Sequence, residues 1–496
     1  MKKLYFFAFL ASAICIQAQT IKPIQIESWV TNADRSALFS KQDKEIQFGG
    51  DRNRGWSPSV IVVDEQLQMQ SVDGFGFALT GGSAELLKKM SANARANILR
   101  ELFATDGKSI GISYLRISIG ASDLNSFVYS YNDLPDGKTD LKLEKFNLSQ
   151  DLNDVIPVMK EILAINPSIQ ILASPWSAPA WMKTSNNPKS GNLKKEYFDV
   201  YALYFVKYIQ AMKAQGISID AITIQNEPLN SNNTPSMQML ASDQKEFIKS
   251  HLGPTFEKNG IKTKIVLFDH NLDRIDYPLS ILNDPEAAKY VDGSGFHHYG
   301  GDLTSMSVMH TAFPDKNLYF TEQMVVEKPG SSSIEIASQV KRLILGASLN
   351  WSRNVILWNI GADPLNDPHT DNGGCSMCQG AITIDKDSIS RNLAYYTIAH
   401  ASKFVRPGSV RIGSTQKGDK VIKFSEDEER QGQSAVRIGI TETYDVLPNV
   451  AFRTPDGKTV LIVVNDSYSV NSFKIQFRGQ FANVRLSPGG VGTYVW

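Results

Sequence analysis

Between residues 72 and 360, eight short apolar segments alternate with amphipathic ones, and this alternation limits the fold more than any other feature. The predicted strands are residues 73–80, 114–120, 170–177, 221–227, 264–270, 295–299, 318–322 and 354–360. Apolar residues at three- and four-residue spacing predict helices over 84–103, 151–165, 196–215, 236–252 and 334–349. Strands that alternate with helices form parallel sheets, and eight such units make a (β/α)8 barrel.

An open, doubly wound sheet is the alternative fold. Its dinucleotide-binding form places a G-x-G-x-x-G turn after the first strand, and Gly74-Phe75-Gly76 with Gly81-Gly82 matches that pattern only weakly. We interpret these glycines as close turns at the strand end. The prediction is therefore an α/β fold with a TIM barrel over residues 69–403.

The segments on either side of the barrel have β texture. Short strand-like runs occupy residues 19–68. More follow in 404–496, at residues 410–413, 420–424, 435–441, 450–454, 459–464, 472–477 and 493–496, and they indicate an antiparallel sandwich. Pro455-Asp456-Gly457-Lys458 between two of these runs indicates a hairpin turn. The N-terminal runs are too few to form a domain alone. We therefore expect them to pair with the C-terminal strands, giving a discontinuous β-sandwich domain attached to the barrel.

The N-terminus resembles an export signal. Lys2 and Lys3 precede an apolar run from Leu4 to Ile16, and Ala18 offers a small residue for cleavage, which predicts a signal peptide over residues 1–18. Lipid attachment at Cys15 is less favoured, because Ile14 stands where such signals use Gly or Ala. No other apolar run approaches the ~20 residues of a membrane helix. We expect an exported protein, periplasmic or at the cell surface, without a membrane span.

The charge balance and the cysteine content limit the classes of partner and cofactor that the sequence predicts. The 51 basic residues balance the 51 acidic ones, so no overall field attracts nucleic acid or an anionic membrane. Cys375 and Cys378 have the spacing of a redox pair or half a zinc site, but no second Cys or His pair matches them. We favour two loop cysteines and leave open whether they are bridged. The sequence does not determine the oligomeric state.

Polar and aromatic residues gather where the predicted strands end, the face on which barrel enzymes place their sites. They are Arg116, Asp123, Trp176, Trp181, Asn226, Glu227, Asp269, His270, His297, His298, Tyr299, Glu322, Trp358 and Asn359. Glu227 and Glu322 each follow a buried strand, and Pro228 is expected to hold Glu227 extended at its strand tip.

Two carboxylates across a pocket suit glycoside hydrolysis, in which one protonates the leaving group and the other attacks or activates water. Aromatic faces suit the C–H patches of pyranose rings, and no cofactor is implied. A metal site built from His297 and His298 with Asp269 or Glu322 is the competing interpretation. It is disfavoured because adjacent residues of a strand point to opposite faces.

Longer motifs resemble glycoside hydrolase family 30, which includes lysosomal-type glucosylceramidases and bacterial and fungal β-1,6-glucanases. The motifs span nearly the whole mature chain: residues 72–76 (VDGFG), 115–117 (LRI), 121–123 (ASD), 172–184 (LASPWSAPAWMKT), 226–228 (NEP), 284–291 (DPEAAKYV), 487–490 (SPGG) and 493–496 (TYVW).

The resemblance implies a retaining mechanism with Glu227 as general acid/base and Glu322 as nucleophile. It also implies that Arg116 lies beneath the carboxylates, that Asn226 binds the sugar 2-hydroxyl, and that Asp123, Trp176 and Trp358 line the subsite at the cleaved bond. His297, His298 and Tyr299 complete the expected substrate-binding set. On this mechanism Glu322 should be ionised beside Arg116, Glu227 should be protonated with a raised pKa, and the carboxyl groups should lie ~5 to 5.5 Å apart.

The sequence departs from the lysosomal-type pattern at two places that bear on substrate. That pattern has His-Trp-Tyr where this chain has His297-His298-Tyr299, and Ala-Cys after the nucleophile where this chain has Gln323-Met324. Losing the Trp disfavours ceramide as the leaving group. We therefore expect a β-1,6-glucanase acting on β-glucan. A glucosylceramidase or broad β-glucosidase is the alternative, and an inactive carbohydrate-binding protein is the alternative of another class.

Overall fold

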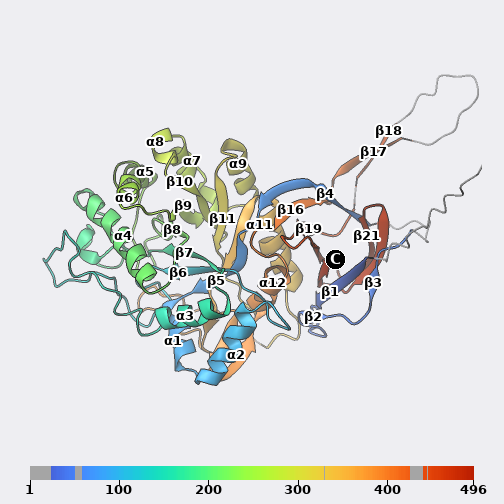
Figure 1. Ribbon diagram of the computed structural model, residues 1–496, viewed down its shortest axis with the longest axis horizontal. Helices are drawn as coiled ribbons and strands as arrows, with labels where there is room; N and C mark the ends of the chain where they lie inside the picture. The colour runs from blue at the N-terminus through green and yellow to red at the C-terminus, as the bar shows by residue number, and fades with distance from the viewer. Residues whose placement is uncertain (1–23, 51–58, 329, 425–438, 444) are drawn as a thin grey trace, which may run out of the picture.

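The structure, a computed structural model, describes residues 24–50, 59–328, 330–424, 439–443 and 445–496. The predicted signal peptide lies outside these residues and stays a prediction. Figure 1 shows a barrel wrapped in helices on the left and a curled β-sheet on the right, with both ends of the chain's sequence, blue and red, contributing to the sheet.

Eight parallel strands close the barrel, which confirms the predicted fold. In chain order they are β5 (Gly74–Leu79), β6 (Tyr114–Ser118), β7 (Gln170–Ser174), β8 (Ala221–Thr223), β9 (Lys264–Asn271), β10 (Val291–His297), β11 (Asn317–Glu322) and β12 (Ser352–Leu357). Inward-pointing side chains fill the barrel with a separate apolar layer of Tyr114, Leu172, Ala221, Val266, Tyr319 and Ile356. The interior is therefore packed, so the chemistry must take place at the strand ends.

Helices cover the barrel, and several are more broken than predicted. They are α1 (Gly81–Lys89), α2 (Ala92–Phe103), α3 (Val155–Ile165), α4 (Phe198–Ala214), α5 (Ala241–Glu246), α6 (Gly253–Lys258), α7 (Asp276–Leu282), α8 (Pro285–Ala288), α9 (Thr304–Ala312), α10 (Ile336–Gln339), α11 (Gly346–Leu349) and α12 (Leu393–Ser402). The prediction of one helix over 84–103 is wrong: Met90 is extended, and the Ser91 side chain caps α2 by accepting from the Ala94 N–H. Two π-helical turns, Phe247–Leu252 and Val340–Leu345, join α5 to α6 and α10 to α11.

The flanking segments form one curled sheet. Its path runs β2 (Ser40–Lys41), β1 (Gln25–Thr31), β23 (Val491–Val495), β20 (Thr459–Val464), β19 (Asn449–Arg453), β16 (Val410–Ser414), β4 (Val60–Ser71), β21 (Asn471–Phe477) and β22 (Gln480–Leu486), with β3 (Ile46–Gln47) also on β1. The N-terminal strands β1 and β4 pair with the C-terminal strands, as predicted. Strand β22 was not predicted from the sequence, and the β4–β21 pairing is parallel where an antiparallel sandwich was expected.

Two smaller sheets complete the fold. One consists of β13 (Gly361–Ala362), β14 (Ile382–Asp385) and β15 (Ser388–Arg391), and the other of β17 (Lys420–Phe424) and β18 (Gly439–Thr443). The predicted strand 435–441 lies partly outside the described residues. Within the described part of the chain, none of the helices is long and apolar enough to cross a membrane.

The barrel and the curled sheet share one apolar core. Val450, Phe452, Val460 and Ile462 of the sheet belong to the same buried cluster as the residues of α12 and of the barrel helices. A second cluster fills the inside of the sheet, around Ile61, Leu461 and Phe473. Because apolar burial is the main source of stability, the sheet is an integral part of the fold that holds the barrel.

Candidate active site

The predicted site residues meet at the carboxyl ends of the barrel strands. Glu322 and His297 are the last residues of β11 and β10, Arg116 lies within β6, and Asp269 lies within β9. The side chains of Arg116, His297 and Asp269 are fully buried. A cluster of so many ionisable groups withdrawn from water requires close pairing.

Glu227 reaches this cluster from a turn. Strand β8 ends at Thr223, and Glu227 has φ of +45°, so the prediction that Pro228 holds it extended is wrong. Its N–H donates to the Asp269 carbonyl (3.0 Å), and its own carbonyl accepts from the Asn230 N–H (2.8 Å). These two bonds hold a left-handed conformation that is uncommon for a residue with a side chain, the kind of strain found at functional sites.

A second irregularity lies in β9. Phe268 and Asp269 have φ of +69° and +64°, and the pairing register with β10 shifts at this point. Such bulges re-aim side chains next to active sites. Here the bulge coincides with the buried Asp269 carboxylate reaching Arg116 and His297.

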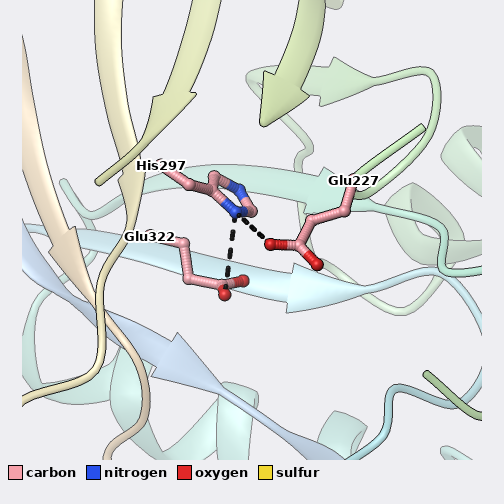
Figure 2. Close-up of side chains that lie close together, drawn as sticks. All are labelled: Glu227, His297 and Glu322. Atoms are coloured by element: carbon pink, nitrogen blue, oxygen red, sulfur yellow. Dashed lines mark hydrogen bonds and ion pairs between the residues drawn. The ribbon is translucent and has the colours of Figure 1, made fainter. Parts of the chain in front are cut away.

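His297 lies between the two glutamates (Figure 2). Its Nδ1 is 3.1 Å from Glu227 Oε1 and 3.7 Å from Glu322 Oε1, and its Nε2 is 3.0 Å from Asp269 Oδ1. One carboxylate oxygen from each glutamate and the His297 nitrogen all lie within 4.8 Å of one another. This separation fits the ~5 to 5.5 Å of retaining glycosidases and is well short of the ~6.5 to 9.5 Å of inverting ones.

Arg116 lies against the nucleophile candidate, as predicted. Its guanidinium donates to Glu322 Oε2 (2.5 Å), to Asp269 Oδ2 (2.8 Å) and to Asn226 Oδ1 (2.7 Å). The bond to Asn226 fixes the amide so that its Nδ2 is the group able to donate to a ligand. Arg116 thus ties the nucleophile and one predicted hydroxyl-binding residue to the same rigid group.

The two glutamates titrate in the opposite order to the expectation. Burial raises the pKa of Glu227, but the hydrogen bond and charge of His297, the charge of His270 and the hydrogen bond from Asn230 lower it to about 2. Burial, together with the Glu227 and Asp269 carboxylates, raises the pKa of Glu322 against the charges of His297 and Arg116. The prediction of a raised Glu227 pKa is therefore wrong for the protein without substrate.

His297 explains this order. Burial lowers its pKa, but the charge of Glu322 and the hydrogen bonds to Asp269 and Glu227 raise it to about 10. The Glu227–His297 pair therefore holds one proton across the physiological pH range, and that proton resides on His297.

The predicted sugar-facing residues line the same region. Trp176 and Trp358 stack with ring centroids 5.3 Å apart, and the buried Trp176 Nε1 has no hydrogen-bond partner among the described residues. Burial and the charges of Glu322 and Glu227 raise the pKa of Asp123 to about 8, so it is protonated at neutral pH. An apolar platform with unpaired donors suits a pyranose ring.

Tyr299 and His298 have different positions. Tyr299 is 40% exposed as a residue, yet its hydroxyl donates to Glu322 Oε1 (3.0 Å). His298 is half-buried and packs edge-on against Phe320, apart from the cluster. Its role in substrate binding stays a prediction.

Two contributors were given no catalytic role from the sequence. Asp269 was named as a strand-end residue and as a ligand of the disfavoured metal site, but it was given no role in hydrolysis. Asn230 was not singled out, yet its Nδ2 donates to Glu227 Oε2 (2.7 Å). Its spacing of three residues from Glu227 is that of a turn partner.

Cys375 and Cys378 form a disulfide, which decides the question left open above. Cys378 packs with Trp176 and Trp358, and Cys375 lies against the same cluster, so the bridge supports the aromatic platform. Within the part of the chain that the structure describes, the ligand atoms close enough to hold a metal ion belong to Glu227, His297 and Glu322, and His298 is not among them.

Comparisons with known proteins identify both domains. The glycosyl hydrolase family 30 TIM-barrel domain matches residues 72–405, and the family 30 beta sandwich domain matches residues 434–494. The endo-1,6-beta-D-glucanase of Neurospora crassa is 33% identical over 407 residues, which cover 79% of this chain and 82% of that protein. The lysosomal acid glucosylceramidase of Mus musculus is 26% identical over 98% of this chain and 94% of that protein.

The fold also matches solved structures. An endo-beta1,6-glucanase aligns with a TM-score of 0.81 and 32% identity, covering 95% of this chain and 99% of the other. The match extends over barrel and sheet together.

Proposed function

The chain belongs to glycosyl hydrolase family 30 and is a glycoside hydrolase, and we propose that it is a β-1,6-glucanase. The observation that carries the proposal is the pair of buried glutamates whose nearest oxygens lie within 4.8 Å, on a chain that shares 32 to 33% of its residues with endo-1,6-β-glucanases over most of its length.

We assign Glu322 as nucleophile. Its Oε2 is held by Arg116 and its Oε1 accepts from Tyr299, so the carboxylate is fixed on both sides. Attack at the anomeric carbon forms a glycosyl ester and removes the charge of Glu322. Arg116 and Tyr299 stabilise the carboxylate again when the ester is hydrolysed.

We assign Glu227 as general acid/base. Protonated, it donates to the departing glycosidic oxygen; ionised, it accepts a proton from the attacking water. With the nucleophile esterified, the negative charge beside Glu227 disappears, which favours the ionised form needed for the second step.

Glucosylceramide cleavage is the second candidate, favoured by the match to the lysosomal enzyme over nearly the whole chain. His298 and Met324 replace the residues typical of that branch. In this structure Met324 contacts Cys378 (3.8 Å between sulfurs), so the second residue after the nucleophile packs on the disulfide-bridged loop. The retained Glu227 and Glu322 argue against an inactive binding protein.

The test is product analysis of the mature protein on linear β-1,6-glucan and on glucosylceramide, with Glu322→Gln as the blank. Release of gentiobiose or longer gentio-oligosaccharides, absent in the blank, supports the proposal, and proton NMR of the first-formed anomer should show β configuration. Cleavage of glucosylceramide alone would instead favour the second candidate.

A further inference from the structure

Asp269 is a fully buried carboxylate that faces other side chains on all sides. Its oxygens accept from His297 Nε2 (3.0 Å), Thr321 Oγ1 (2.6 Å), Arg116 Nη2 (2.8 Å), Ser174 Oγ (2.8 Å) and Thr223 Oγ1 (2.7 Å). Five donors hold the carboxylate in its charged form and leave no room for a substrate hydroxyl. Its function must therefore act through a neighbour.

His297 is that neighbour. Because Nε2 is committed to Asp269, Nδ1 is the ring atom that faces the glutamates. Nδ1 lies closer to Glu227 Oε1 (3.1 Å) than to Glu322 Oε1 (3.7 Å). The imidazole is fully buried, so its Nδ1 proton has Glu227 as the nearest acceptor.

We propose that Asp269 and His297 are positioning residues of the glycosidase reaction: Asp269 keeps the imidazole doubly protonated, and His297 passes its Nδ1 proton to Glu227 Oε1 as the leaving group departs. The proposal rests on the double-displacement mechanism above and is independent of the linkage cleaved.

The protons balance over one turnover. The Nδ1–H bond of His297 breaks as the O–H bond of Glu227 forms, and Glu227 gives that proton to the glycosidic oxygen while the C–O bond breaks. Water then loses a proton to Glu227 as its oxygen bonds the anomeric carbon and frees Glu322. Glu227 finally returns the proton to Nδ1, which restores the starting state.

The charged and titratable groups around His297 come from several barrel strands and the segments that follow them, and their positions agree with this proton transfer. Glu227 follows β8, Asp269 and His270 come from β9, Glu322 from β11, Tyr299 from the loop after β10, and Arg116 reaches the cluster from β6. Burial, together with the charge of His297, lowers the pKa of His270 against the charges of Glu227 and Asp269. His297 is the imidazole whose Nδ1 and Nε2 both reach carboxylates of the cluster, so it is placed to exchange a proton with Glu227.

The first experiment observes that proton directly. In the full chain labelled with ¹⁵N-histidine, the signals lost in His297→Asn identify the two ring nitrogens. Both should be protonated at pH 7, and Asp269→Asn should move the His297 titration downward by about one pH unit or more. The matched control is His251→Asn, which removes another histidine that contacts an aspartate, Asp199, at 2.6 Å. This variant should leave the ring-nitrogen signals of His297 unchanged. An unprotonated Nδ1 at pH 7 would overturn the proposal.

Should Asp269→Asn fail to fold, Glu227→Gln makes the same test, because removing the carboxylate acceptor must also lower the His297 titration. A His297 titration that is unmoved in Glu227→Gln contradicts the proposal.

Kinetics separate proton supply from structural support. His297→Asn should lose about 10²-fold or more in kcat/KM on an unactivated glucan, and less than about tenfold on 2,4-dinitrophenyl β-glucoside, whose leaving group needs no acid. Equal losses on both would mean a structural role. If wild type cleaves the aryl glucoside and not β-1,6-glucan, the substrate proposal fails while the NMR titration still decides the role of His297.

Discussion

At the scale of single residues, neighbours give two identical glutamates different chemistry. Glu322 is paired with a permanent cation, and Glu227 with an imidazole that can release its proton. Arginine does not titrate in proteins, whereas histidine does. The pairing therefore suits Glu322 to remain a charged nucleophile and suits Glu227 to exchange a proton.

Replacing either glutamate should separate these roles. Glu322→Gln should abolish turnover of every substrate, because the amide cannot form the ester. Glu227→Gln should lose about 10² to 10⁴-fold on glucan through lost acid/base catalysis. Burst kinetics with an activated aryl glucoside checks this, since Glu227→Gln should still form the glycosyl-enzyme and release it slowly. Similar residual rates in both variants on that substrate would contradict the assignment.

The raised pKa of Asp123 leads to a prediction of how KM depends on pH. Its pKa, raised to about 8, keeps it protonated at neutral pH, where it can donate to a sugar hydroxyl. Above pH 8 it ionises and adds a charge near Glu322 and Glu227, so KM should rise on the alkaline side. Asp123→Asn should remove this rise, because the amide donates at every pH. Measuring KM from pH 6 to 9.5 for both proteins checks the effect, and an alkaline rise that persists in the variant would assign it to another group.

At the scale of elements, irregular segments supply much of the site. A turn beyond β8 carries Glu227, a bulge in β9 aims Asp269, and the loop between β13 and β14 carries the disulfide. That loop is anchored to the sugar site, because the Thr370 N–H donates to the Asp123 carbonyl (2.9 Å) and Cys378 packs on the Trp platform. The loop is therefore expected to shape substrate binding more than catalysis.

Cys375→Ser with Cys378→Ser tests this expectation. KM should rise while kcat changes less, since both glutamates lie outside the loop. The free energy of unfolding should fall by only about 2 kcal/mol, because the bridge closes a very short loop. Reductant should give wild type the same KM as the double variant and should leave the double variant unchanged. A loss confined to kcat would contradict this role.

At the scale of the whole molecule, α12 connects the barrel to the curled sheet through buried hydrogen bonds. His400 of α12 is fully buried and bonds Thr493 Oγ1 of β23 through Nδ1 (2.9 Å) and Thr31 Oγ1 of β1 through Nε2 (2.8 Å). One imidazole thus joins the barrel to strands from both ends of the chain. Its loss would leave two buried hydroxyls without that partner, at a cost of about 1 to 3 kcal/mol each.

The buried His400 should also make the stability of the fold sensitive to acid. Burial lowers its pKa from the ordinary 6.5 to about 3, so between these values the unfolded chain binds a proton that the folded one does not. Stability from this group is full above pH 6.5 and falls as pH drops, by up to about 1.4 kcal/mol per pH unit. His400→Gln should be less stable at pH 7, and its deficit should shrink toward pH 4. Denaturant unfolding at several pH values checks this, and a constant deficit would exclude the titration.

The sequence by itself determined the barrel, its eight strands and the two glutamates. These follow from local periodicity and from the rule that parallel strands end on one face, and neither needs knowledge of distant contacts. It also placed the N-terminal strands in the C-terminal sheet, because they had no partners of their own. Strand β22, which was not predicted, and the break at Met90 in the helix predicted over 84–103 show where local patterns were too weak to define an element or its end.

Only the tertiary structure decided where the proton of the site resides. The bonds that set it join residues 206 apart (Arg116 and Glu322), 70 apart (Glu227 and His297) and 28 apart (His297 and Asp269). A pKa depends on charges and on exclusion of water, and both arise when distant segments pack together. The sequence names the carboxylates, and their ionisation follows from the folded arrangement around His297.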